Sequence, residues 1–308
     1  MPNTQIIQTQ GLTKRFGARV AVDDVTLSVP RGCAFGFLGH NGAGKTTTIR
    51  MLLGLTAADA GTMALRGLPV PSRRAQALSR VGAIVEEPRF HAHLTGGENL
   101  RVAAAVRGPE TFPRIDGALR RVGLGERADE KVGHYSQGMR QRLGVARCLI
   151  ADPELLVLDE PTNGLDPAGI LEFREMVRAL VGEGRTVFLS SHLLDEVEKA
   201  CHAAAIIDAG RIVKAGPIAE LTRATHEELV IECDDPGRAL VLLSEDHAVA
   251  RVEPIDGLLR VTLARAGAAA ELNHRLVVAG VAVARLEPVR ETLEERFLEM
   301  TSKLEAVA

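Results

Sequence analysis

The chain has 308 residues, of which 46% are hydrophobic and 25% are charged, an ordinary composition for a globular protein. It contains no run of 18 or more apolar residues and no secretory signal, so no membrane-spanning helix is expected. The net charge of -3 does not favour nucleic-acid binding, and four scattered cysteines do not suit a disulfide framework or a paired-cysteine metal site.

The charge is unevenly distributed along the chain. Residues 1–222 contain 27 basic and 24 acidic residues, whereas residues 223–308 contain 10 and 16. This shift from a slightly basic to a clearly acidic composition predicts a domain boundary near Thr222.

Strands and helices alternate in the first 222 residues. Ile6–Gln10 and Ala21–Val29 are typical of an antiparallel pair. Apolar strands are then predicted at Cys33–Leu38, Val81–Val85, Leu155–Leu158, Thr186–Ser190 and Ala203–Asp208. Helices are predicted at Lys45–Leu55, Gly97–Val106, Gln137–Ile150, Ala168–Val181 and Leu194–Ala200. Near-continuous apolar strands separated by helices indicate an α/β fold with a parallel sheet covered on both faces.

The acidic tail has a different pattern. Its predicted elements are a strand at Glu228–Cys233, a helix at Arg238–Ser244, strands at His247–Glu253 and Leu258–Leu263, a helix at Ala268–Ala279 and a strand at Val281–Glu287. The Asp256-Gly257 pair is a strong hairpin signal. The order βαββαβ predicts a small ferredoxin-like α+β domain, followed by a last helix at Thr292–Lys303.

A glycine-rich segment follows the first apolar strand and leads into a helix. Its residues are Gly39, His40, Asn41, Gly42, Ala43, Gly44, Lys45, Thr46 and Thr47. They match G-x-x-x-x-G-K-[ST], the P-loop, whose backbone N–H groups surround phosphates at a helix N-terminus. The Lys45 ammonium can neutralise the β- and γ-phosphates, and the Thr46 hydroxyl can ligate Mg²⁺.

Other chemically active side chains follow the neighbouring strands. They are Glu86, the adjacent pair Asp159 and Glu160, and His192. Ligands of parallel sheets bind beyond the carboxyl ends of the strands, so these groups are expected beside the P-loop. Each has an alternative interpretation: a solvated acidic turn for the carboxylates, and a structural role for His192. Phe16 can stack on adenine or pack in the core.

Further motifs resemble those of one family, the ATP-binding subunits of ABC transporters. Tyr135–Arg142 (YSQGMRQR) resembles the signature, Asp159–Asp166 (DEPTNGLD) resembles a Walker B motif joined to a D-loop, and Ser190-Ser191-His192 resembles an H-loop. The resemblance covers about Gln5–Leu221. It implies a P-loop NTPase fold with an antiparallel β subdomain and a helical subdomain.

The chain departs from the family pattern at two places. Gln137 and Met139 replace a glycine and the glutamine of the usual LSGGQ signature. Glu86 stands where most relatives have the Q-loop glutamine, which resembles the bacitracin and lantibiotic exporter branch. The neighbouring Glu87 is the alternative alignment. The segment Arg290–Leu298 resembles the C-terminal extension of drug-exporter ATPases.

The resemblance implies a head-to-tail homodimer with two composite ATP sites. One copy would supply Phe16, the P-loop, Glu86, Asp159, Glu160 and His192, and the other copy Ser136, Gly138 and Asp166. Lys45, Glu160, His192 and Glu86 would act in hydrolysis. Thr46, Asp159 and Glu86 would serve as Mg²⁺ ligands.

The resemblance also implies a separate membrane permease as partner, gripped by the groove around Glu86–Gly96, and a peripheral location at the cytoplasmic face of the membrane. Export of drugs, antibiotics or peptides is the favoured function. Two alternatives remain, a soluble ABC ATPase acting on nucleic acid or ribosomes and a regulatory module that binds nucleotide without hydrolysing it. Nucleic acid is not an expected partner.

Overall fold

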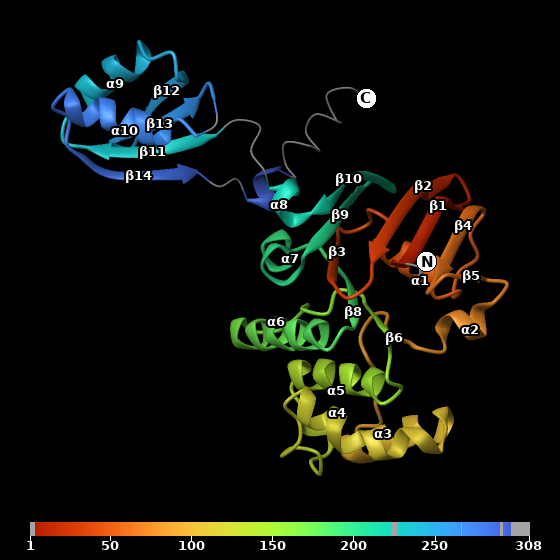
Figure 1. Ribbon diagram of the computed structural model, residues 1–308. Helices are drawn as coiled ribbons and strands as arrows, with labels where there is room; N and C mark the ends of the chain where they lie inside the picture. The colour runs from red at the N-terminus through yellow and green to blue at the C-terminus, as the bar shows by residue number, and fades with distance from the viewer. Residues whose placement is uncertain (1–3, 223–226, 266, 290–291, 297–308) are drawn as a thin grey trace. The chain divides into compact units, whose positions relative to one another are not determined.

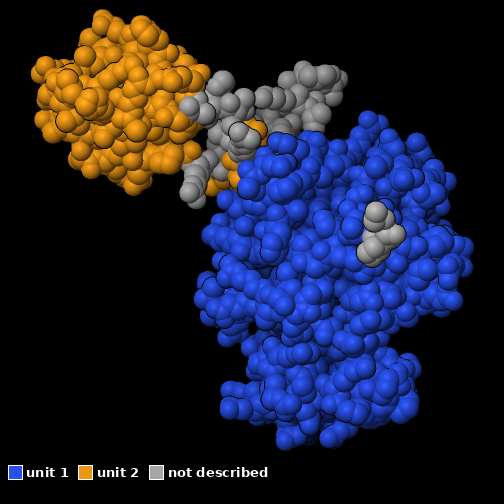
Figure 2. Space-filling view, viewed as in Figure 1, with its two compact units in different colours: residues 1–221, 297–308 blue, residues 222–296 orange. Residues whose placement is uncertain are grey.

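The computed structural model describes residues 4–222, 227–265, 267–289 and 292–296. The chain divides after Leu221 into two compact units, which Figure 2 colours separately. Within the described residues, no helix combines the length and the apolar composition needed to cross a membrane.

An antiparallel sheet forms the first layer of unit 1. It contains β1 (Gln5–Phe16), β2 (Arg19–Pro30), β4 (Ala60–Leu65) and β5 (Leu68–Val70), in the order β2-β1-β4-β5. The first two strands form the expected antiparallel pair but extend beyond the predicted ranges. The sequence patterns did not predict β4 and β5.

A six-stranded sheet forms the second layer. It contains β3 (Ala34–Leu38), β6 (Val81–Ile84), β7 (Leu155–Leu158), β8 (Thr186–Ser191), β9 (Ala203–Asp208) and β10 (Arg211–Pro217). The order is β10-β9-β3-β8-β7-β6, and all neighbours are parallel except β9 and β10. The five predicted apolar strands are therefore confirmed as one parallel sheet, with β10 added at its edge.

Helices lie on both sides of this sheet and at one end of unit 1 (Figure 1). Next to the sheet are α1 (Lys45–Leu52), α6 (Pro167–Gly182) and α7 (Leu194–Ala200), and short helices form at α2 (Arg74–Leu78) and α8 (Ile218–Leu221). The helical end contains α3 (Gly96–Arg107), α4 (Ile115–Arg121), α5 (Gln137–Leu149) and two 3₁₀ segments, Pro109–Arg114 and Val132–His134.

A capping box fixes the start of α3. The Thr95 hydroxyl accepts a hydrogen bond from the Glu98 N–H, and the Glu98 carboxylate accepts one from the Thr95 N–H. The backbone hydrogen bond from Thr95 lowers the pKa of Glu98. These paired bonds satisfy two N–H groups that the first turn of a helix leaves free.

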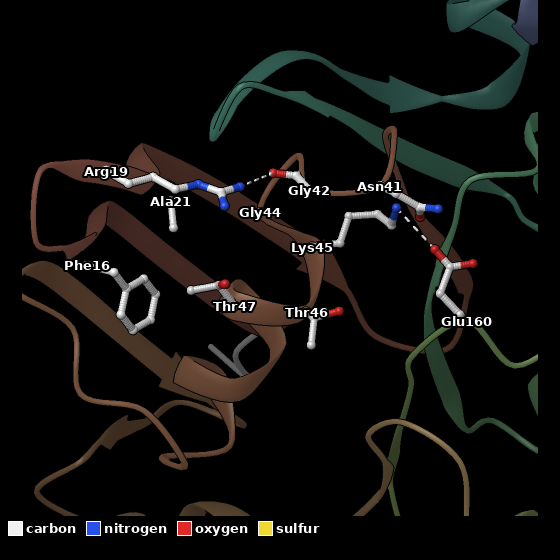
Figure 3. A pocket seen from close by; sticks show the side chains of 10 residues that line it. All are labelled: Phe16, Arg19, Ala21, Asn41, Gly42, Gly44, Lys45, Thr46, Thr47 and Glu160. Carbon is white, nitrogen blue, oxygen red and sulfur yellow. Dashed lines mark hydrogen bonds and ion pairs between the residues drawn. The ribbon is translucent and has the colours of Figure 1, made fainter.

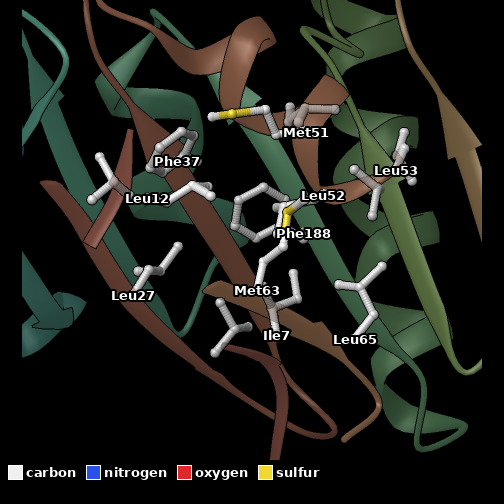
Figure 4. Close-up of a cluster of buried hydrophobic side chains, with 14 of the residues drawn as sticks. Ile7, Leu12, Leu27, Phe37, Met51, Leu52, Leu53, Met63, Leu65 and Phe188 are labelled. Carbon is white, nitrogen blue, oxygen red and sulfur yellow. The ribbon is translucent and has the colours of Figure 1, made fainter. Parts of the chain in front are cut away.

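Two layers of unit 1 share one apolar core, part of which Figure 4 shows. The ring of Phe188 in β8 lies 6.0 Å from that of Phe35 and 5.5 Å from that of Phe37, both in β3. Ile49 and Leu52 of α1 are fully buried in the same cluster. This packing fixes the helix that follows the glycine-rich segment against the strand that precedes it.

Unit 2 contains β11 (Glu228–Cys233), α9 (Pro236–Ser244), β12 (Val249–Ile255), β13 (Leu258–Leu263), α10 (Ala269–Val278) and β14 (Val283–Val289). Its antiparallel sheet has the order β12-β13-β11-β14. Asp256 and Gly257 both have positive φ in the predicted hairpin turn. The element order matches the prediction, and assignment to the ferredoxin-like class stays a prediction. Most of the predicted helix Thr292–Lys303 lies outside the described residues.

We predict that Gly36→Ala destabilises unit 1. A Cβ atom at Gly36 would lie 2.2 Å from Cγ1 of Val197 in α7, so the helix must shift to admit it. Overpacking of this kind costs about 1–3 kcal/mol. The expected result is a lower urea midpoint, followed by circular dichroism of the full chain.

Gly182→Ala is the matched control, because a Cβ atom at Gly182 meets open space. Its effect on the midpoint should be small, within about 0.5 kcal/mol or slightly stabilising. Equal midpoints for the two variants would show that α7 does not hold β3 tightly.

Candidate nucleotide site

The glycine-rich segment turns tightly between β3 and α1. Gly44 has φ 108° and directly precedes the helix. A Cβ atom on Gly39 would lie 2.2 Å from the Ile207 carbonyl oxygen, and one on Gly44 would lie 2.5 Å from the Ala21 carbonyl oxygen. Because backbone carbonyls cannot yield to a side chain, glycine is required at both ends of the turn.

The turn borders a pocket of about 350 Å³ (Figure 3). It is lined by Phe16, Arg19, Ala21, Asn41, Gly42, Gly44, Lys45, Thr46, Thr47 and Glu160. The other predicted P-loop residues, Gly39, His40 and Ala43, lie in the turn itself. Arg19 was not predicted; its guanidinium donates to the Gly42 carbonyl oxygen at 3.4 Å.

The two ends of the pocket differ chemically. Phe16 is 53% exposed, which is unusual for a large aromatic side chain and leaves its ring available to a planar ligand. Lys45, in contrast, is 5% exposed. Its ammonium donates to the carbonyl oxygens of Gly39 at 2.5 Å and His40 at 3.2 Å.

Glu160 completes the surroundings of this buried ammonium. Its Oε1 lies 3.0 Å from Lys45 Nζ, and its Oε2 lies 2.8 Å from His192 Nδ1. The predicted lysine, glutamate and histidine are thus brought together from three separate strand ends. Figure 3 shows Lys45 and Glu160 pointing toward one another across the pocket.

Ser190 of β8 organises the two carboxylates that follow β7. Its hydroxyl donates to Asp159 Oδ1 at 2.5 Å and accepts from the Glu160 N–H at 2.9 Å. Asp159 is buried, and Glu160 has a left-handed backbone with φ 46°. The sequence placed Ser190 in the H-loop segment but did not predict its contacts with Asp159 and Glu160. These contacts depend on the pairing of β8 with β7, which the sequence does not reveal.

Glu86 lies apart from the pocket lining in this structure. Its side chain is 64% exposed, forms an ion pair with Arg50 of α1, and has a backbone φ of 65°. Glu87 is also exposed. Neither of the two alternative Q-loop carboxylates is among the residues that border the phosphate pocket.

A second pocket, of about 370 Å³, contains the signature and D-loop residues. Ser136 caps α5 by accepting from the Met139 N–H at 3.2 Å, and Asp166 caps α6 by accepting from the Gly169 N–H at 2.8 Å. Gly138 lies beside them. The side-chain amide of Gln137, the departure from the usual signature, donates to the Asn163 carbonyl oxygen at 3.2 Å.

A buried strand, a glycine turn and a helix bearing Lys45 and Thr46 define the P-loop of a nucleotide-binding protein. The ABC transporter family model matches residues 22–163. Together with a relative that is 40% identical over 96% of this chain, this match shows that the chain belongs to the ATP-binding subunits of ABC transporters. It is therefore an ATP-binding protein that hydrolyses ATP, as predicted.

Two curated relatives are informative. The chain is 40% identical over 297 residues to the bacitracin transport ATP-binding protein BcrA of Bacillus licheniformis, covering 96% of this chain and 97% of that protein. It is 42% identical over 240 residues to the Nod factor export ATP-binding protein I of Ralstonia nicotianae, covering 75% of this chain and 72% of that protein.

A solved structure of an ATP-binding subunit of an ABC transporter is similar in fold. It has a TM-score of 0.63 and 30% sequence identity, and the match covers 71% of this chain and 92% of that chain. The predicted α/β P-loop fold is therefore confirmed.

We predict that Ser190→Ala lowers kcat for ATP hydrolysis and leaves ATP affinity nearly unchanged. The variant loses the hydrogen bonds that hold Asp159 and the Glu160 backbone. A hydrogen bond to a charged group contributes about 1.5–3 kcal/mol, which corresponds to a kcat loss of about 10- to 100-fold. Steady-state phosphate release and equilibrium ATP binding measure the two effects.

Ser191→Ala is the control, because the Ser191 hydroxyl bonds locally to the backbone of Leu193. It should retain kcat within about twofold of the unmodified chain. Equal kcat values for the two variants would show that the Ser190 hydrogen bonds do not support ATP hydrolysis.

Proposed function

We propose that this chain is the ATP-hydrolysing subunit of an exporter that energises a separate membrane permease. Its ATPase portion is residues 1–222, and residues 223–308 form an accessory domain. The observation that carries the catalytic part is the Glu160 carboxylate, held between Lys45 and His192 beside the phosphate pocket.

ATP binding begins with charge and backbone dipoles. The phosphates occupy the turn from Gly39 to Thr47, where the N-terminus of α1 presents N–H groups and its positive dipole end. Lys45 exchanges its contacts with backbone oxygens and Glu160 for the β- and γ-phosphates. The exposed ring of Phe16 stacks on the adenine base.

Hydrolysis depends mainly on positioning and charge stabilisation. When Lys45 moves to the phosphates, Glu160 is released to orient the attacking water and accept its proton. The water oxygen bonds to the γ-phosphorus as the bond from that phosphorus to the ADP oxygen breaks. His192, whose Nδ1 lies 2.8 Å from Glu160 in this structure, exchanges that contact for a hydrogen bond that it donates to the γ-phosphate. Asp159 remains fixed through Ser190.

Mg²⁺ fits the donor set at this pocket. Within the described residues, no group of three or more His, Cys, Asp or Glu side chains could form a metal cage by itself. Mg²⁺ instead prefers few protein oxygens together with phosphate and water. Thr46 and Asp159 supply such oxygens, and Glu86 would join them once its carboxylate leaves Arg50 and turns toward the pocket. When bound, the ion neutralises charge on the phosphates.

Two separate pockets support a homodimer. Ser136, Gly138 and Asp166 lie in a pocket whose lining residues differ from those of the phosphate pocket. The helix N-terminus capped by Ser136 suits an anion. A second copy in head-to-tail orientation brings this pocket against the γ-phosphate of the first copy, which yields two composite sites.

The names of the relatives support the proposed permease and cargo. Their names assign them to bacitracin transport and Nod factor export, so antibiotics, peptides or other amphipathic molecules are the proposed cargo. The subunit acts as a peripheral protein at the cytoplasmic face of the membrane. The permease contacts the groove around Glu86–Gly96.

We predict that Glu160→Gln retains ATP binding but lowers the hydrolysis rate at least about 100-fold, because an amide cannot accept the proton of water. ATP should then hold the variant as a dimer. Phosphate release, ATP binding and size-exclusion chromatography with light scattering measure these three results.

The double variant Glu160→Gln, Ser136→Glu tests whether Ser136 of one copy faces the γ-phosphate that the other copy binds. A carboxylate at Ser136 repels the γ-phosphate of the opposing copy, so ATP should bind without inducing a dimer. Hydrolysis at the normal rate by Glu160→Gln would refute the proposed role of Glu160.

We predict that Glu86→Gln raises the Mg²⁺ concentration required for half-maximal ATPase activity by about tenfold, the usual scale for losing a supporting ligand. Glu87→Gln is the matched control and should leave this concentration unchanged. If only Glu87→Gln raised this Mg²⁺ concentration, Glu87 and not Glu86 would be the functional Q-loop carboxylate.

A further inference from the structure

Two side chains near the end of β1, those of Lys14 and Phe16, contact one another. Phe16 borders the phosphate pocket and is 53% exposed. The Lys14 ammonium lies over the Phe16 ring, 5.3 Å from its centre. A cation within about 6 Å of a ring centre is attracted by the negative face of the ring. One face of the Phe16 ring is therefore covered by a positive charge.

An ion pair holds the Lys14 side chain in this position. Its Nζ lies 2.9 Å from Asp59 Oδ1, and the side chain is 13% exposed. Lys199, by comparison, pairs with Asp195 and leaves 51% of its side chain exposed. Because a lysine is seldom withdrawn from solvent unless it is paired, the Asp59 carboxylate allows the Lys14 ammonium to stay against the ring.

Asp59 is itself fixed by two further hydrogen bonds. Its Oδ2 accepts from the Arg15 N–H at 2.6 Å, and its own N–H donates to the Thr13 carbonyl oxygen at 2.9 Å. The hydrogen bond from the Arg15 backbone and that from Lys14 lower the pKa of Asp59, so its carboxylate stays charged at neutral pH. Asp59 directly precedes β4, in the segment that follows the P-loop helix α1. The anchor of Lys14 thus comes from a part of unit 1 that is distant in the chain.

Lys14 does not border the phosphate pocket. The cationic residues that line this pocket are Arg19 and Lys45, and Lys14 is not among the lining residues. Arg19 pairs with Phe16 across the turn that joins β1 to β2. A ligand of this pocket can therefore touch Phe16, and Lys14 can act on that ligand only through the ring.

We propose that Lys14, anchored by Asp59, is a positioning residue that holds the Phe16 ring for stacking on the base of the bound nucleotide. This inference rests on the proposed function, in which Phe16 stacks on adenine, and deepens it. Ordering an exposed side chain when a ligand binds lowers affinity, and Lys14 fixes the ring before the nucleotide arrives. The ammonium also draws the π electrons toward one face, which makes the other face a better partner for an electron-rich purine.

The test uses the full chain and the variant Lys14→Met, which keeps an unbranched apolar side chain and removes the charge. The Kd for ATP should rise about three- to tenfold, the scale on which an ammonium over a ring contributes at a partly exposed site. The KM for ATP should rise by the same factor, with a change in kcat of less than about twofold, because only nucleotide binding is altered. Isothermal titration calorimetry and steady-state phosphate release measure these values. Lys14→Arg keeps a cation over the ring and should restore the ATP affinity to within about twofold.

Inorganic tripolyphosphate distinguishes an effect on the base from an effect on the phosphates, because it carries the charge of ATP without a base. Lys14→Met should bind tripolyphosphate within about twofold of the unmodified chain, which also shows that the P-loop of the variant is folded. Lys199→Met is the matched control, since it removes a lysine from an ion pair outside the site, and it should bind both ligands normally. Equal losses of affinity for ATP and tripolyphosphate in Lys14→Met, or an unchanged ATP affinity, would overturn the proposal.

A double-mutant cycle with Phe16→Leu tests whether Lys14 acts through the ring. Once the ring is gone, Lys14→Met should weaken ATP binding by less than about twofold beyond the loss caused by Phe16→Leu alone. Losses that add fully in the double variant would show that Lys14 acts independently of Phe16 and would overturn the proposal.

The single variant Phe16→Leu separates this inference from the proposed function. An unchanged ATP affinity in Phe16→Leu would refute the stacking of Phe16 on adenine, on which the role of Lys14 depends. A weaker ATP affinity in Phe16→Leu, with normal affinity in Lys14→Met, would refute the role of Lys14 alone. Phosphate release by the unmodified chain tests ATP hydrolysis independently of both.

Discussion

Lys45 carries a positive charge that is almost completely withdrawn from solvent, and the phosphate pocket is arranged around it. A buried ammonium group is unfavourable unless oxygens surround it. The turn from Gly39 supplies two carbonyl oxygens, and Glu160 supplies a carboxylate 3.0 Å away. In the proposed reaction, incoming phosphates offer this ammonium equivalent partners, so ligand binding and the release of Glu160 are parts of the same exchange.

Glycines in the turn after β3 and aromatic rings on β3 and β8 hold Lys45 in this position. Gly39 and Gly44 allow the turn to pass close to backbone carbonyls, and the rings of Phe35, Phe37 and Phe188 fix β3 against β8. Strand β8 also carries Ser190, which holds the carboxylates that follow β7. Packing in the core therefore fixes the positions of Lys45, Asp159 and Glu160 through the three adjacent strands β3, β8 and β7.

The elements with strong local patterns were predicted well. Leu155–Leu158, Ala203–Asp208 and Leu194–Ala200 have the predicted bounds, because short apolar runs and helical periodicity are local signals. Strands β4, β5 and β10 were not predicted. Many of their residues are exposed or half-buried, so hydrophobic alternation is weak. Long-range pairing with β1 stabilises β4, and β5 and β10 pair with their chain neighbours β4 and β9 across short turns.

The sequence by itself determined that this chain carries a P-loop for a nucleotide, because the P-loop is a contiguous motif with a fixed geometry. It also indicated which polar residues follow the neighbouring apolar strands. It also indicated the family through the signature, D-loop and H-loop segments. Only the tertiary structure decided which groups meet: Glu160 with both Lys45 and His192, Glu86 with Arg50, and Lys14 with Asp59. These contacts join residues far apart in the chain, and their distances depend on strand order and packing, which no local pattern encodes.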